Sequence, residues 1–212
     1  MARRKSNSGP DGLLLVDKPK GLTSFDVVAR LRRLFATRRI GHTGTLDPLA
    51  TGLLAVLLGR ATRLAPYITA TDKTYLARFE FGASTDTYDA QGTVLNRADP
   101  ADLAAISGHT IDRLLPSFRG EISQIPPAYS AIKVQGERAY ARARRGDTVE
   151  LAPRSVVVHR FDRLSYQAPA GDFIISCSKG TYIRSLVHDL GAGLGVGGHL
   201  ADLRRTQVGQ FS

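Results

Sequence analysis

GHTGTLDPLATGLL, residues 41–54, combines three glycines and one proline with a single histidine and a single acid. Glycine and proline at this density are typical of a stiff, tightly turned loop. The ring of Pro48 disfavours the helical conformation for Asp47, which is therefore expected to be extended or in a turn. The loop should hold His42 and Asp47 at a fixed place beside the apolar run Leu53–Leu58. For Asp47 taken alone, the simpler alternative is that Asp-Pro pairs commonly start turns.

Composition is that of a globular protein made of one large domain, or of one domain with a smaller insertion. The chain has 212 residues, 42% of them hydrophobic and 23% charged, so it can bury a sizeable core. The single cysteine, Cys177, excludes a disulfide scaffold, and no His and Cys residues stand at metal-ligand spacing, so no metal site is predicted. No apolar run approaches the roughly 20 residues of a membrane span, and the N-terminus does not resemble a secretory signal. We therefore expect a cytoplasmic protein without a membrane partner.

Positive charge is concentrated in the first third of the chain. The net charge is +10, and residues 1–63 carry 12 Lys and Arg against four Asp and Glu. Residues 64–149 are balanced, and residues 150–212 carry a net +2. A basic field beside a rigid loop favours a polyanionic substrate, with nucleic acid first. The alternative is a solvated basic face or tail.

Hydrophobic periodicity predicts strands interspersed with helices. The predicted strands are Gly12–Val16, Leu53–Leu58, Lys73–Phe81, Val156–Val158 and Phe173–Cys177. The predicted helices follow a capping box at Thr23-x-x-Asp26, cover Ala61–Ile68, cover residues 98–119 with a proline break, and end near Leu190. Residues 1–11 are expected to be a disordered basic arm, and residues 82–91 a polar loop. This order of elements predicts an α/β or α+β fold on a mixed, largely antiparallel sheet.

Three other patterns suggest chemistry less strongly. The glycine-rich residues 191–198 follow a helix and lack a Gly-Lys-Ser/Thr sequence, so they are not a phosphate loop. Asp86 and Asp89 have no third ligand nearby in sequence, which favours a structured turn over a metal site. The arginines of Arg138–Arg145, together with Tyr140, suit phosphate contacts and stacking on looped RNA, and a plain solvated helix fits them equally well.

Taken together, several segments resemble the TruB-type tRNA pseudouridine synthases, and they occur in the order of that family. The matching segments are GLLLVDKPKGLTSFD (12–26), RRIGHTGTLDPLATGLL (38–54), DKTY (72–75), STDTYDAQG (84–92), QIPPAYSAIKVQG (124–136) and CSKGTYIRSLVHDLG (177–191). They cover most of the chain. The resemblance implies the pseudouridine-synthase fold and isomerisation of the T-loop uridine of tRNA, position 55, to pseudouridine, with no metal and no organic cofactor.

The resemblance also assigns roles to residues. Asp47 corresponds to the catalytic aspartate, Tyr75 to the active-site tyrosine that stacks on the target base, and Arg184 to the arginine that pairs with the catalytic carboxylate. His42 corresponds to a histidine that enters the T loop as the target nucleotide leaves, and Lys18 to a supporting residue. The expected substrate-binding residues are His42, Tyr182, Lys18, Arg63 and Leu203.

The expected partner is the T stem-loop of tRNA. Residues 121–150 correspond to an insertion that closes over the RNA. Family members usually continue into a small C-terminal RNA-binding domain, the PUA domain, which we expect to be absent from this chain. We expect a monomer without an obligatory protein partner. Two alternatives stay open, namely a guide-RNA-dependent pseudouridine synthase and an RNA-binding or RNA-folding module without turnover.

Overall fold

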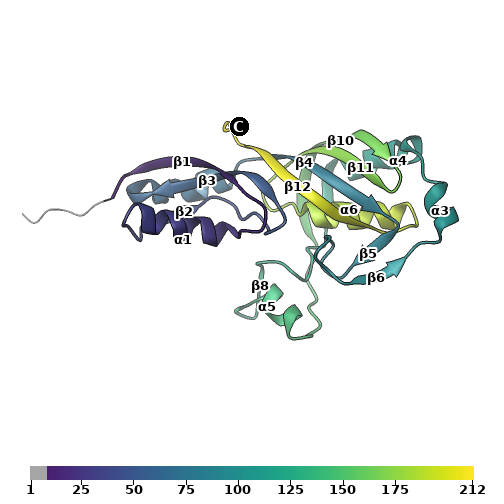
Figure 1. The fold of residues 1–212 in the computed structure, drawn as a ribbon, viewed down its shortest axis with the longest axis horizontal. Helices are drawn as coiled ribbons and strands as arrows, with labels where there is room; N and C mark the ends of the chain where they lie inside the picture. Colours follow the sequence, from purple (N-terminus) through teal and green to yellow (C-terminus); the bar gives the residue numbers. More distant parts are fainter. Residues whose placement is uncertain (1–8) are drawn as a thin grey trace, which may run out of the picture. The chain divides into compact units, whose positions relative to one another are not determined.

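The computed structural model describes residues 9–212, which form two compact units. Unit 1 comprises Met1–Lys73 and Arg204–Ser212, and unit 2 comprises Thr74–Leu203 (Figure 1). Most of the basic arm expected over residues 1–11 lies outside the described residues. Asp11, at its end, is described, and its carboxylate accepts hydrogen bonds from the backbone N–H and the Nε of Arg60, both at 2.6 Å.

Unit 1 is built on β3 (Thr51–Leu58), the apolar run that follows the Asp47 loop. Both β1 (Gly12–Lys18) and β2 (Ile40–His42) pair antiparallel with β3, and β12 (Gly198–Val208) pairs parallel with it through Arg204 and Arg205. Most of β3 is buried, including all of Leu54–Leu58. The strands predicted at Gly12–Val16 and Leu53–Leu58 are confirmed. Both are longer than predicted, because Asp17 and Lys18 continue the pairing of β1 and Thr51 continues that of β3.

The first helix of unit 1 begins at the predicted capping box. Helix α1 (Ser24–Leu34) follows Thr23, whose Oγ1 accepts a hydrogen bond from the Asp26 N–H at 3.0 Å. The Asp26 carboxylate accepts the Thr23 N–H in return, at 2.8 Å. This reciprocal pair satisfies two backbone donors that helix geometry leaves open. The helix buries Val27 and Val28 and lies against β2 (Figure 1).

The single helix expected over residues 61–68 is instead two short pieces. A 3-10 turn, η1 (Gly59–Leu64), is followed by α2 (Ala65–Thr69). Pro66 lies in the first turn of α2 and has no N–H to donate to the preceding turn, so the hydrogen-bond ladder restarts there.

Unit 2 contains a sheet in the order β12-β4-β11-β10-β7. Its members besides β12 are β4 (Lys73–Phe81), β11 (Ala170–Cys177), β10 (Arg154–Gln167) and β7 (Gly120–Gln124). Strand β4 has the predicted alternation, with Tyr75, Ala77, Phe79 and Phe81 buried. Phe79 stacks on Phe173 with ring centroids 4.5 Å apart, and Phe161 meets both rings edge-on. The mixed, mostly antiparallel sheet predicted from the sequence is confirmed.

Strand β10 is much longer than the predicted Val156–Val158. Its pairing with β11 shifts register between Val158 and Arg160 and again between Arg163 and Ser165. Each bulge interrupts the two-residue alternation from which strands are predicted, while the backbone ladder continues. Residues 121–124 pair with β10 as part of β7.

The helices of unit 2 come from three stretches of the sequence. The helix with a proline break predicted over 98–119 is instead three pieces: α3 (Pro100–Ala104), α4 (Gly108–Leu114) and the 3-10 turn η2 (Leu115–Phe118). Ser107 caps α4 and so starts a new helix, and Pro116 lies in the first turn of η2. Strands β8 (Lys133–Val134) and β9 (Glu137–Arg138) form a short hairpin. Helix α5 (Ala139–Arg144) follows β9 directly and precedes β10 in the sequence. Helix α6 (Ile183–Gly193) buries almost its whole first two turns.

Residues 82–91 are only partly the polar loop that was predicted. Ala83–Thr85 form β5, which pairs with β6 (Val94–Arg97), a strand that the sequence did not reveal. All four residues of β6 are exposed, so it has no apolar face to produce an alternating pattern. The rest of the segment is the structured turn expected for Asp86 and Asp89. The Asp86 carboxylate accepts the Thr93 N–H, and that of Asp89 accepts the Gln91 N–H.

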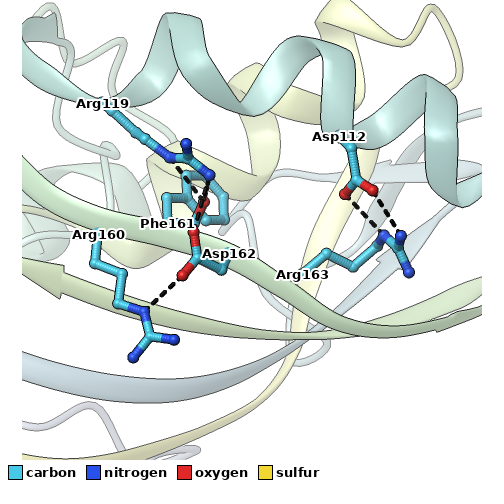
Figure 2. Close-up of polar contacts among 6 residues, drawn as sticks. All are labelled: Asp112, Arg119, Arg160, Phe161, Asp162 and Arg163. Carbon is cyan, nitrogen blue, oxygen red and sulfur yellow. Dashed lines mark hydrogen bonds and ion pairs between the residues drawn. The ribbon is translucent and has the colours of Figure 1, made fainter.

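A group of half-exposed ion pairs connects β10 to the helices beside it (Figure 2). Both guanidinium nitrogens of Arg163 that face Asp112 on α4 donate to its carboxylate, at 2.9 and 2.7 Å. Arg119 donates to the Phe161 carbonyl and to Asp162, which also accepts from Arg160. Exposed pairs of this kind contribute little individually, roughly 0–1 kcal/mol, so they fix the direction of β10 more than they stabilise the fold.

Candidate active site

The loop that carries Asp47 is held in place by three backbone contacts within unit 1. Ser24, the first residue of α1, accepts the Leu46 N–H through its Oγ at 2.8 Å. The Pro48 carbonyl accepts the Gly21 N–H at 2.8 Å, and the Asp47 carbonyl accepts the Ala50 N–H at 3.0 Å. The acid is therefore fixed on both sides, which is what the glycine- and proline-rich sequence predicted. Its side chain is half-buried.

A buried lysine lies close to this carboxylate. Lys18 is 0% exposed, and its Nζ donates to the carbonyls of Pro19 and Leu22 at 3.0 and 2.6 Å. Burial lowers the pKa of Lys18, and the charge of Asp47 acts in the opposite direction. The side chains of Lys18 and Asp47 therefore interact electrostatically. Both of these carbonyl contacts of Lys18 are to the turn that precedes α1.

A second buried cation, Arg205 of β12, holds the other side of the loop. It is 2% exposed, and it donates from Nε to the Leu53 carbonyl at 2.7 Å and from Nη2 to the Gly44 carbonyl at 3.1 Å. Gly52 makes this approach possible, since a Cβ there would lie 2.3 Å from the backbone oxygen of Arg205. The φ of Gly52, +94°, also favours glycine. Sequence reasoning did not select Arg205.

His42 ends β2 and faces the start of the loop. Its Nδ1 accepts the Gly44 N–H at 3.4 Å, which requires a lone pair on that nitrogen. Burial lowers the pKa of His42, and the charge of Arg205 lowers it further. The imidazole is therefore neutral near pH 7, with its proton on Nε2. Arg63, by contrast, is exposed on η1 and takes no part in the contacts that hold the loop.

In unit 2, Arg184 lies in the first turn of α6 and joins two distant segments. It is 4% exposed, and it donates from Nη1 to the Thr87 carbonyl and from Nη2 to the Tyr129 carbonyl, both at 2.9 Å. The Asp89 carboxylate lies 3.7 Å from Nη1 and is 5% exposed. Two carbonyls and a carboxylate thus fix the plane of the guanidinium group.

Asp89 is a functional candidate that sequence reasoning did not select. Its carboxylate accepts hydrogen bonds from Thr87 Oγ1 at 2.8 Å and from the Gln91 N–H at 3.0 Å. These contacts confirm the structured turn, and they also keep an acid beside Arg184. The motif TDTYDAQG was sufficient to predict the turn. It could not predict the ion pair, because Arg184 lies 95 positions after Asp89 in the chain.

Tyr182 precedes α6, and its backbone is held by two hydrogen bonds. The Gln124 side chain donates to the Tyr182 carbonyl at 3.0 Å and accepts the Tyr182 N–H at 2.8 Å. The guanidinium carbon of Arg154 lies 4.6 Å from the centre of the Tyr182 ring. Tyr75 lies on the buried face of β4, and Leu203 is buried on β12.

Comparison with known proteins identifies the family. Residues 32–183 match the model of the TruB family pseudouridylate synthase N-terminal domain, and residues 184–212 match that of the tRNA pseudouridylate synthase B C-terminal domain. The chain belongs to the TruB family of pseudouridylate synthases. The predicted resemblance is therefore confirmed.

Curated relatives of this TruB-family chain carry the name tRNA pseudouridine synthase B. The chain is 53% identical to that of Thermobifida fusca (strain YX) over 95% of its own length and 71% of the relative's. It is also 53% identical to that of Leifsonia xyli subsp. xyli (strain CTCB07), over 94% of this chain and 68% of the relative.

Solved structures similar to this chain include chains of two complexes. A chain of "Crystal Structure of a Cbf5-Nop10-Gar1 Complex" matches 95% of this chain with 31% identity and a TM-score of 0.73. A chain of "Structure of H/ACA RNP bound to a substrate RNA containing 2'-deoxyuridine" matches it fully, with 27% identity and a TM-score of 0.70. This chain spans about half the length of those solved chains, 50% and 55%.

Within residues 9–212, no three His, Cys, Asp or Glu side chains are grouped as metal ligands would be. In the same range, no helix is both long enough and apolar enough to cross a membrane.

Proposed function

We propose that this TruB-family protein converts the T-loop uridine of tRNA, position 55, to pseudouridine without a cofactor. The observation that carries the proposal is the 53% identity to the tRNA pseudouridine synthase B of Thermobifida fusca over 95% of the chain. The match extends over nearly all of the chain and 71% of the relative.

The reaction breaks the C1′–N1 bond, turns the uracil and joins C1′ to C5. C5 loses its proton and N1 gains one, so the product is an isomer of the substrate. Asp47 is the proposed catalytic carboxylate. A carboxylate can attack an electron-poor carbon and later leave, or it can stabilise positive charge at C1′. The fixed loop supports this role, since a side chain that must meet one atom of a bound nucleoside has to be positioned before the substrate arrives.

Arg184 and Tyr75 are proposed to act on the same nucleoside. The guanidinium of Arg184 would keep the acid ionised and oriented, and its own fixed plane supports that role. The Tyr75 ring would stack on the extruded uracil, which returns part of the stacking lost on leaving the loop, on the order of 1–3 kcal/mol. His42 would fill the space that the nucleotide vacates, and its neutral ring suits a place between stacked bases.

The remaining candidates are proposed to contact or support the RNA. Tyr182 is a second aromatic beside Arg184, and Leu203 would form an apolar wall of the base pocket. Arg63 and the positively charged segment 1–63 would meet phosphates of the T stem. We expect the protein to act as a monomer in the cytoplasm on tRNA alone.

Tritium release from tRNA carrying 5-³H-uridine tests the proposal, because this hydrogen leaves only when the C1′–C5 bond forms. The wild-type chain should release one equivalent from the T loop, and Asp47→Asn should release none while binding tRNA as tightly as wild type. Asp11→Asn is the matched control, since it removes an exposed carboxylate of the same unit that pairs with Arg60. Residual turnover by Asp47→Asn would remove Asp47 from this role.

The same experiment separates the alternatives. No release at stoichiometric protein, with tRNA binding intact, would identify an RNA-binding module. Release that requires an added guide RNA and protein partners would identify a guide-dependent synthase. One related solved chain is part of a Cbf5-Nop10-Gar1 complex.

A further inference from the structure

An aromatic stack lies directly beside the residues that hold Arg184. The ring of Tyr88 stacks on the imidazole of His188 with centroids 3.8 Å apart and an angle of 11° between the planes. Tyr88 lies between Thr87 and Asp89, both of which contact Arg184. None of the roles assigned above uses either ring.

The geometry of α6 explains why the two contacts occur together. Arg184 and His188 are four residues apart, so they project from the same face of the helix, one turn from each other. Three consecutive residues, Thr87 to Asp89, thus meet one helix face, with the stack at the centre. Strand β12 holds the same turn from another side, since Leu200 N–H donates to the Tyr88 carbonyl at 3.0 Å and Ala90 N–H to the Leu200 carbonyl at 2.9 Å.

The backbone of Tyr88 indicates that the stack has a use beyond packing. Its φ is +61°, a left-handed conformation that is uncommon for any residue with a side chain and that glycine adopts without strain. Such a conformation persists where surrounding contacts over-determine it. A turn that only had to reverse the chain would favour glycine or asparagine here, so the large ring in this position points to a requirement for the ring itself.

The surroundings of His188 support the same view. Its Nδ1 is buried and has no hydrogen-bond partner within residues 9–212. Burial lowers the pKa of His188, and the neighbouring Asp189 acts in the opposite direction. The neutral ring therefore serves as a flat surface rather than as a charged donor.

We propose that the Tyr88–His188 stack positions Arg184 by seating the Thr87–Asp89 turn on α6. Both rings are positioning residues, since they act through Arg184 and do not themselves touch the substrate. This inference rests on the proposed function, because it assigns the orientation of Arg184 a consequence for the rate of pseudouridine formation.

Paired substitutions that keep or remove the rings test the inference. Tyr88→Ala and His188→Ala remove the stack, whereas Tyr88→Phe and His188→Phe retain two stacked rings. We expect the alanine variants to lose about tenfold or more in single-turnover rate at saturating tRNA, with tRNA affinity unchanged, since a small displacement of a positioning group can cost up to about a hundredfold. The phenylalanine variants should stay within about threefold of wild type, and the double alanine variant should be no slower than the slower single variant.

Hydrogen exchange of the backbone amides supplies a readout that does not depend on activity. The Leu200 and Ala90 amides should exchange faster in the alanine variants and as in wild type in the phenylalanine variants, because the turn leaves β12 when the stack is lost. The inference would be overturned if all four single variants had the same single-turnover rate and the same exchange of the Leu200 and Ala90 amides. Lower melting temperature with an unchanged rate per folded molecule would also overturn it, since the stack would then be merely structural. If the wild-type chain itself released no tritium, the proposed function would fail, while faster exchange confined to the alanine variants would still show that the stack seats the turn.

Discussion

Within residues 9–212, each unit contains one almost completely buried arginine, and the two make different contacts. Arg205 in unit 1 donates to two backbone carbonyls, of Gly44 and Leu53, and so fastens the loop that carries the candidate acid. Arg184 in unit 2 also donates to two carbonyls, of Thr87 and Tyr129, but a buried carboxylate, Asp89, lies beside it.

The difference shows how the same side chain can serve as a fastener or as a candidate catalytic group. A guanidinium that binds only neutral carbonyls stabilises the segments that it joins, and its position matters more than its charge. Where a carboxylate is added, the orientation of the planar group is further restricted, as a group that must act on a substrate requires. Substitutions at the two positions should therefore separate stability from catalysis.

The largest effect is expected from Arg184→Lys. An ammonium group cannot span the carbonyls of Thr87 and Tyr129 with the planar fork of a guanidinium, and we expect the single-turnover rate to fall by about a hundredfold or more. Rapid-quench measurements at saturating tRNA would check this, with tRNA affinity measured in parallel. A rate close to wild type would show that Arg184 is a fastener like Arg205.

Asp89→Asn should have the next largest effect on rate. The amide can still accept from Thr87 and Gln91, so the turn should stay folded, but the charge beside Arg184 is lost. We expect a loss of roughly tenfold to a hundredfold in rate, with little change in the free energy of unfolding. If instead stability fell and the rate per folded molecule did not, Asp89 would belong to the scaffold alone.

Arg205→Lys should show the opposite balance. Two buried carbonyls would lose their donors, and we expect the free energy of unfolding to fall by about 2–3 kcal/mol. The rate per folded molecule should decline less than in Arg184→Lys. Urea unfolding followed by circular dichroism would measure the first quantity, and an unchanged midpoint would contradict the assigned role.

The smallest effect concerns pH. Burial lowers the pKa of His42 below its ordinary value of about 6.5, so the unfolded chain binds a proton more readily than the folded chain does. Stability should therefore be lost as the pH falls below about 6.5, and the loss should end once the pH is below the folded pKa. His42→Gln should reduce this loss by about 1 kcal/mol or less, measured as the difference in unfolding free energy between pH 7 and pH 5. A steeper pH dependence in the variant would contradict the direction of the shift.

The sequence by itself determined the features that depend on neighbours along the chain. The capping box of Thr23 and Asp26, the alternation of β4 and the stiff bend at Asp47 and Pro48 are local, since each depends on residues a few positions apart. The motifs were specific enough to indicate the family as well.

Only the tertiary structure decided which groups hold the candidate site. Arg205 reaches the Gly44 carbonyl across 161 positions, and Arg184 reaches that of Thr87 across 97. Neither contact leaves a periodic signal, because a buried arginine has the same letter as an exposed one and a backbone carbonyl belongs to every residue type. The strained Tyr88 and its stack on His188 were hidden for the same reason. Their meaning lies in which surfaces meet when the chain folds.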